Sequence, residues 1–97
     1  MNKILVIDDD ESINELIKIN LELSGFDVIQ AYEGTVGFAL CKQEMPDLII
    51  LDVMMPSIDG YTVAKRIREN KNLENIPILM LTALGFLKNK ILGFNIG

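Results

Sequence analysis

The fold is decided by residues 46–56, which read Pro46-Asp47-Leu48-Ile49-Ile50-Leu51-Asp52-Val53-Met54-Met55-Pro56. At the centre of this stretch a continuous apolar run, residues 48–51, stops at an acid, Asp52. Short unbroken apolar runs are typical of strands that are buried on both faces of a parallel sheet. Two similar runs lie elsewhere in the chain: residues 4–7 stop at Asp8, and residues 78–81 stop at Thr82. The sequence therefore predicts three buried strands, each followed by a polar side chain.

Between these strands the apolar residues take the spacing of amphipathic helices. Ile13, Leu16, Ile17 and Leu21 follow a helical spacing with polar residues between them, and Ser24-Gly25 provides a helix stop. Further elements are predicted as a strand at 26–31 and helices at 35–45, about 60–70 and 84–96. We therefore expect a βαβαβαβα order, which gives a parallel sheet covered by helices on both faces.

Composition limits the class of protein. The chain has 97 residues, 49% hydrophobic and 24% charged, as expected for one small globular domain. Its net charge of −5 argues against a basic nucleic-acid surface and against a polybasic membrane anchor. The absence of histidine excludes imidazole catalysis, and the single cysteine, Cys41, cannot form an intramolecular disulfide and is expected to be a small buried hydrophobe.

The sequence contains no pattern expected of a targeting or membrane segment. The continuous apolar run before Asp8 has only four residues, too few for the core of a signal peptide. The longest weakly polar run, residues 76–87, is too short to span a bilayer. We therefore expect a cytoplasmic protein that does not associate with membranes.

Acidic side chains follow two of the predicted strands. Ligands of open parallel sheets bind at the carboxyl ends of the strands, so Asp8, Asp9 and Asp52 are expected to converge if the first and third strands are neighbours. Clustered carboxylates repel one another, and Mg²⁺, which prefers oxygen ligands, relieves that repulsion. An aspartate beside such a metal can act as a nucleophile towards phosphorus. Taken alone, residues 8–11 could instead be a helix N-cap with an acidic first turn, and Asp52 a turn former.

At this point the sequence resembles a known family, the receiver domain of two-component response regulators. The resemblance covers the whole chain and implies one receiver domain over residues 1–97 with a flavodoxin-like, CheY-like doubly wound α/β fold. The matching motifs are Ile4-Leu5-Val6-Ile7-Asp8-Asp9-Asp10-Glu11, residues 46–56, Asp59-Gly60 and Ile76-Pro77-Ile78-Leu79-Met80-Leu81-Thr82-Ala83.

The resemblance implies a role for each matching residue. Asp52 would be the phosphoacceptor, which takes its phosphoryl group from the phosphohistidine of a histidine kinase or phosphotransfer protein. Mg²⁺ would be held by Asp9, Asp52 and the backbone carbonyl of Met54, with Asp8 acting through water. The remaining positions are a switch hydroxyl, the small residue after it and two residues that shape the neighbouring loop: Thr82, Ala83, Pro56 and Gly60.

The family fold has five strands in the order 2-1-3-4-5, whereas the sequence stops at Gly97, which matches the end of the fourth helix. We therefore expect strand order 2-1-3-4 with the fifth β-α unit missing, together with that unit's phosphate-contacting lysine and switch aromatic. Such a chain would expose its fourth strand as an edge, and the fourth strand or the fourth helix, with Leu84, Phe86 and Leu87, could mediate a homo-oligomer.

Three functions remain open at this point. The leading one is a phosphoacceptor signalling domain, which assists its own phosphorylation and dephosphorylation but is not an enzyme and does not itself bind nucleic acid. The alternative is an interaction module that keeps the fold but no longer switches, because the lysine and the aromatic are absent. A flavin-binding protein is disfavoured, since a flavin phosphate needs amide donors rather than acids.

Overall fold

The computed structural model describes residues 2–55 and 58–81. Four strands alternate with three helices in these residues. The strands are β1 (Lys3–Ile7), β2 (Asp27–Ala31), β3 (Leu48–Asp52) and β4 (Ile78–Leu81). The helices are α1 (Glu11–Leu23), α2 (Gly34–Glu44) and α3 (Gly60–Arg68). The predicted helix at 84–96 lies outside the described residues.

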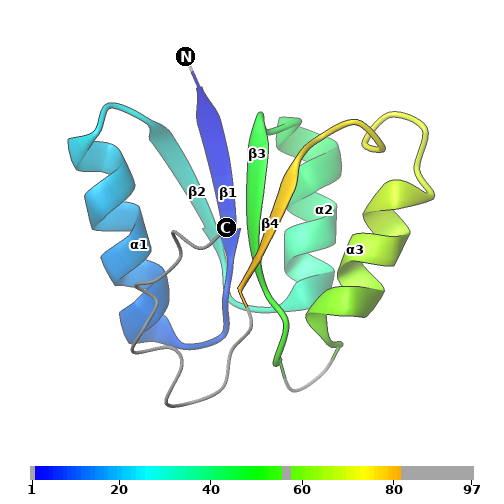
Figure 1. Cartoon of the computed structure of the whole chain (residues 1–97), viewed down its shortest axis with the longest axis horizontal. Coiled ribbons are helices and arrows are strands. Elements are labelled where there is room, and N and C mark those ends of the chain that lie inside the picture. The colour runs from blue at the N-terminus through cyan, green and yellow to red at the C-terminus, as the bar shows by residue number, and fades with distance from the viewer. Residues whose placement is uncertain (1, 56–57, 82–97) are drawn as a thin grey trace.

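The strands form one parallel sheet in the order β2-β1-β3-β4, as predicted (Figure 1). Ile7 pairs with Ala31 on one side and with Leu51 on the other, so the carboxyl ends of three strands lie at one edge of the sheet. On the far side of β3, Asp52 pairs with Leu81 of β4. Asp52 is therefore the last residue of β3 rather than the first residue after it.

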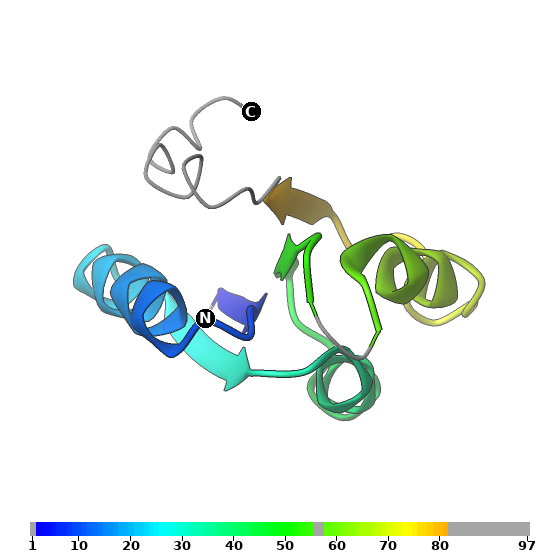
Figure 2. The same cartoon turned by 90° about the horizontal axis from the view of Figure 1, so that it is seen from below.

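The helices cover both faces of the sheet, which is also as predicted. Seen from below, α1 lies on one face and α2 and α3 lie on the other (Figure 2). Alternate residues of a strand face opposite sides of the sheet. Val6 therefore belongs to the apolar cluster that includes Ile17 of α1, whereas Ile7 belongs to the cluster on the other face, which includes Cys41 of α2 and Val63 of α3. Two apolar layers, one on each face, therefore hold the sheet.

The helix ends follow simple chemical rules. The Asp10 carboxylate caps α1 by accepting the backbone N–H of Ile13 at 3.0 Å, and Asp59 caps α3 in the same way through Thr62 at 2.9 Å. At the other end of α2, Met45 takes a left-handed conformation with φ of 47° before the next proline. These caps define where the chain turns from each helix towards the next strand.

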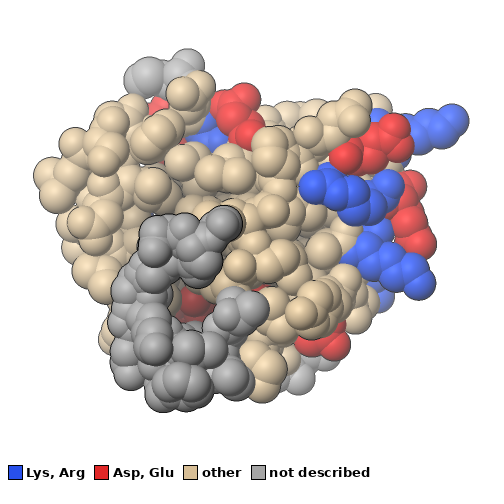
Figure 3. Space-filling model, in the orientation of Figure 1, with Lys and Arg blue, Asp and Glu red and all other residues tan. Residues whose placement is uncertain are grey.

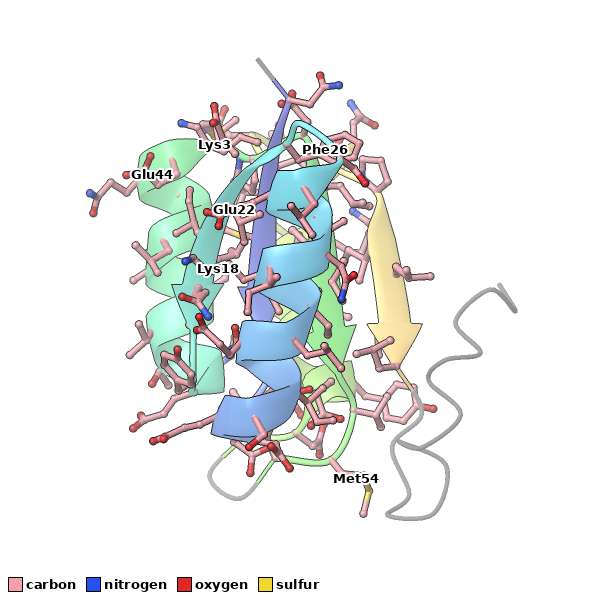
Figure 4. All side chains as sticks on the ribbon, turned by 90° about the vertical axis from the view of Figure 1, so that its left-hand side faces the viewer. Lys3, Lys18, Glu22, Phe26, Glu44 and Met54 are labelled. Carbon is pink, nitrogen blue, oxygen red and sulfur yellow. The ribbon has the colours of Figure 1, made fainter. Side chains whose placement is uncertain are left out.

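Two ion pairs involve side chains labelled in Figure 4, one within a helix and one between two elements. Lys18 and Glu22, one helical turn apart on α1, lie 3.5 Å from each other, and Lys3 of β1 reaches Glu44 at the end of α2 at 3.1 Å. Within the described residues no helix is both long enough and apolar enough to cross a bilayer.

Candidate functional site

Three acidic side chains meet at the carboxyl edge of the sheet. One carboxylate oxygen from each of Asp8, Asp9 and Asp52 lies within 4.8 Å of the other two. The pairing of Ile7 with Leu51 places the ends of β1 and β3 side by side, which brings these acids together although Asp8 and Asp52 are far apart in the sequence. The convergence expected from the strand ends is therefore present.

Burial makes this cluster electrostatically costly. Asp8 and Asp52 have no exposed surface, and Asp9 is the most exposed of the three. Carboxylates that are close together and withdrawn from water repel each other strongly. A bound divalent cation would offset this repulsion, and an all-oxygen set suits a hard ion such as Mg²⁺ or Ca²⁺. The donor set therefore fits a metal that prefers oxygen.

Backbone N–H groups orient the two buried carboxylates. Asp8 Oδ1 accepts a hydrogen bond from the backbone N–H of Asp10 at 2.9 Å, and Asp52 Oδ1 accepts one from Met54 at 3.2 Å. Each acid thus turns one oxygen back towards its own chain. Such bonds fix the direction of the carboxylate and stabilise its ionised form.

The loop after β3 positions Met54 beside the acids. Its side chain is 56% exposed and points away from the molecule in Figure 4. A contribution of Met54 to a metal site would therefore come from the backbone and not from the thioether. Pro56, predicted to shape this loop, lies outside the described residues.

Gly60 closes the same loop. Its N–H donates to the carbonyl of Val53 at 2.9 Å, and a Cβ on Gly60 would overlap the carbonyl oxygen of Asp52. Only glycine allows α3 to start so close to the backbone that carries Asp52. The two remaining predicted site residues, Thr82 and Ala83, lie outside the described residues, directly after the last residue of β4.

Sequence reasoning missed one polar residue beside the site. Asn14 of α1 is completely buried, and its side chain donates hydrogen bonds to the carbonyls of Asp8 and Ala31, both at 2.9 Å. The signal was present, because Asn14 lies three residues before Ile17 and seven before Leu21, on the apolar face of the helix. A polar residue on that face implies a buried partner.

The fold is shared with many solved structures. A putative response regulator from Chloroflexus aurantiacus superposes with a TM-score of 0.82 at 38% identity, over 99% of this chain and 79% of that chain. The chemotaxis protein CheY4 of Vibrio cholerae superposes with a TM-score of 0.81 at 30% identity, over 97% of this chain and 80% of that chain. These similarities confirm the CheY-like flavodoxin fold.

Sequence comparison gives the same result. The chain is 53% identical over 97 residues to the DNA-binding dual master transcriptional regulator RpaA of Synechocystis, covering all of this chain and 40% of that protein. It is 50% identical over 95 residues to the alkaline phosphatase synthesis transcriptional regulatory protein PhoP of Bacillus subtilis, covering 98% of this chain and 39% of that protein. The chain thus spans about two fifths of the length of these relatives. Residues 4–97 match the response regulator receiver domain, and the chain belongs to this family.

Proposed function

We propose that the protein is the phosphoacceptor domain of a two-component phosphorelay, with Asp52 as the residue that is phosphorylated. The observation that carries this proposal is the meeting of three carboxylates within 4.8 Å at the ends of β1 and β3. Membership of the receiver family supports it, because phosphorylation-based signalling is the role of that family. The unit proposed for this role is one receiver domain over residues 1–97.

The proposed transfer is a displacement at phosphorus. An oxygen of the Asp52 carboxylate attacks the phosphoryl group of a phosphohistidine on a kinase or phosphotransfer protein. The new P–O bond forms as the P–N bond breaks, and the imidazole nitrogen keeps the bonding electron pair. The product is an aspartyl phosphate.

The residues around Asp52 have distinct proposed roles. Asp9, Asp52 and the backbone carbonyl of Met54 would hold Mg²⁺, and Asp8 would act through a metal-bound water. When bound, Mg²⁺ neutralises negative charge on the transferring phosphoryl oxygens. The bond from the Met54 N–H keeps one Asp52 oxygen directed towards the loop, and the other Asp52 oxygen is the proposed nucleophile towards phosphorus.

The change is proposed to leave the site through the residues that follow β4. Thr82 would donate its hydroxyl to the phosphoryl group, and Ala83 would leave room for that movement. Phosphorylation is then a local electrostatic event that biases a two-state element. We place these steps in the cytoplasm, where histidine kinases present their phosphohistidine.

The relatives are named as transcriptional regulators, and we propose that this segment corresponds to their receiver part and does not itself bind nucleic acid. Most of the Lys and Arg side chains visible in Figure 3 lie on the side of the molecule where α3 lies, and the last turn of this helix carries Lys65, Arg66 and Arg68. Acidic side chains lie among them in the same view. A mixed surface of this kind lacks the continuous positive charge that binds phosphate backbones.

Phosphorylation by acetyl phosphate tests the proposal. With Mg²⁺ present, intact-mass spectrometry should show one added phosphoryl group, and EDTA should prevent it. Asp52→Asn and Asp9→Asn should both lose the adduct, whereas Asp27→Asn, which removes the same charge from an exposed position on β2, should keep it. An unmodified wild-type protein would favour the alternative function, an interaction module that does not switch.

A further inference from the structure

Asn14 is a buried amide whose hydrogen-bonding groups are all used. Both of its donated bonds, to the carbonyl oxygens of Asp8 and Ala31, are 2.9 Å long. Its Oδ1 accepts a bond from Nε2 of Gln30, also at 2.9 Å. Because two of the three partners are carbonyl oxygens, the orientation of the amide is determined by its surroundings. Burial of an amide is tolerated only with such complete pairing.

These bonds join three elements at the edge where the acids meet. Ala31 is the last residue of β2, and Asp8 follows the last residue of β1. The backbone N–H of Asp8 also donates to the carbonyl of Ala31 at 3.1 Å, so that Asp8 is held through both its N–H and its C=O. Asn14 thereby fixes the ends of two strands against α1.

The segment that carries the acids is held on both sides of Asp9. On one side Asp8 is fixed by Asn14 and Ala31, and on the other Asp10 donates its N–H to Asp8 and caps α1. Asp9 lies between these two anchored residues. The position from which its carboxylate projects therefore depends on the bonds that Asn14 makes.

Attachment of the helix alone does not require Asn14. The helix has its own N-cap in Asp10, and its apolar face buries Ile17 with Ile13 and Leu21 partly buried beside it. Leucine has the same branched arrangement of side-chain heavy atoms as asparagine but is larger, and it has a better helix propensity and would add apolar contact at this position. The apolar face and the N-cap already attach α1 to the sheet, and what Asn14 adds is the fixing of the two strand ends.

We propose that Asn14 is a positioning residue of the metal site, which sets the placement of the Asp8 and Asp9 carboxylates and so the affinity for Mg²⁺. This inference rests on the proposed function, because it assumes that the acids bind the metal. Mg²⁺ requires near-octahedral geometry at about 2.0–2.1 Å and tolerates little displacement of its ligands. Groups that orient metal ligands typically change affinity by about 10–100-fold when they are removed.

The test is the dissociation constant of Mg²⁺, measured by calorimetry below the melting transition of each variant. Asn14→Leu should raise it about tenfold or more. Gln30→Ala, which removes the orienting bond to Asn14 from a half-buried residue, should raise it about threefold. The matched control is Leu73→Ala, since Leu73 is fully buried beside Met45 at the other end of the sheet. This control should lower the melting temperature and leave the dissociation constant within about twofold of wild type.

Several outcomes would overturn the inference. One is a folded Asn14→Leu variant that binds Mg²⁺ as tightly as wild type; should that variant not fold, unchanged binding by Gln30→Ala has the same meaning. Another is an equal loss of affinity in Leu73→Ala, which would show that affinity follows stability alone. If the wild type binds no Mg²⁺, or if Asp9→Asn binds it as tightly as the wild type does, the proposed metal site is refuted as well. The failure of each proposal is thus distinguishable.

Discussion

Replacement of Gly60 by alanine should damage both the fold and the acidic site. The Cβ of alanine would overlap the carbonyl oxygen of Asp52 and lie 2.6 Å from the Cα of Val53. Both atoms belong to the backbone, so no change of rotamer can relieve the contact. The loop must instead move away from α3, which would weaken the 2.9 Å bond from the Gly60 N–H to Val53.

The size of the effect follows from these distances. Ordinary contact begins at 3.4 Å, so the Cα of Val53 must move by about 0.8 Å, the difference between 3.4 and 2.6 Å. Overpacking of this kind costs about 1–3 kcal/mol, and the better helix propensity of alanine returns at most about 1 kcal/mol. A net loss of about 1–2 kcal/mol lowers the melting temperature by about 4–8 °C per kcal/mol in a domain of this size.

Gly34→Ala is the matched control, because Gly34 also begins a helix, α2. There the two nearest atoms to an added Cβ are the Cγ2 methyl groups of Ile58 and Val63, the latter at 2.7 Å, and the nearest backbone atom, the carbonyl oxygen of Ile58, is 3.2 Å away, so the overlap is mainly with side chains. Melting followed by circular dichroism should therefore show a smaller loss for Gly34→Ala. The rate of phosphorylation by acetyl phosphate should fall about tenfold or more only in Gly60→Ala, because Asp52 moves. The steric argument would be refuted if Gly60→Ala melted within about 2 °C of wild type. It would also be refuted if Gly34→Ala were no more stable than Gly60→Ala.

Three further predictions concern charge and burial. Without Mg²⁺, Asp9→Asn should raise the melting temperature by about 4–8 °C for each kcal/mol of carboxylate repulsion that it removes. The same variant should no longer show the rise in melting temperature that added Mg²⁺ gives the wild type. An unchanged melting temperature without Mg²⁺ would contradict strong repulsion between the carboxylates. Burial raises the pKa of Cys41 to about 11, so between pH 9 and 11 the unfolded chain releases the thiol proton while the folded chain keeps it, and stability measured by urea titration should fall as the pH rises through that range. Lys3→Ala should cost no more than about 1 kcal/mol in the same titration, because its 3.1 Å pair with Glu44 is partly exposed.

The sheet could be predicted because its signals are local. Each of the three buried strands is a continuous apolar run, and the end of the run predicts the end of the strand. The prediction differs from the structure only at β3, which extends one residue further, to Asp52. The connection between α3 and β4 carries no such local signal, although Leu73 and Ile76 are buried there and extend the apolar cluster under α2 and α3. Two apolar residues in a short loop have no periodicity that would reveal their partners.

The second helix shows where an apolar pattern does not reveal the buried face. The many apolar residues of 35–45 define no clear face in the sequence. Gly37 and Cys41 are buried, Phe38 is half-buried, and Val36 is 46% exposed. The buried face of α2 consists mainly of small residues, which let the helix approach the sheet closely. Glycine counts little on a hydrophobicity scale, so this face does not appear in the apolar pattern.

The run of acids after β1 illustrates how two interpretations of one motif can apply to different residues of it. The helix-cap interpretation holds for Asp10, whose carboxylate accepts the N–H of Ile13. The site interpretation is supported for Asp8 and Asp9, which meet Asp52 across the sheet edge. The two roles depend on each other, because the residue that caps the helix also donates its N–H to Asp8. No spacing rule assigns these roles, since they are decided by bonds to backbone groups that only the folded chain brings together, and Asn14 escapes sequence reasoning for the same reason.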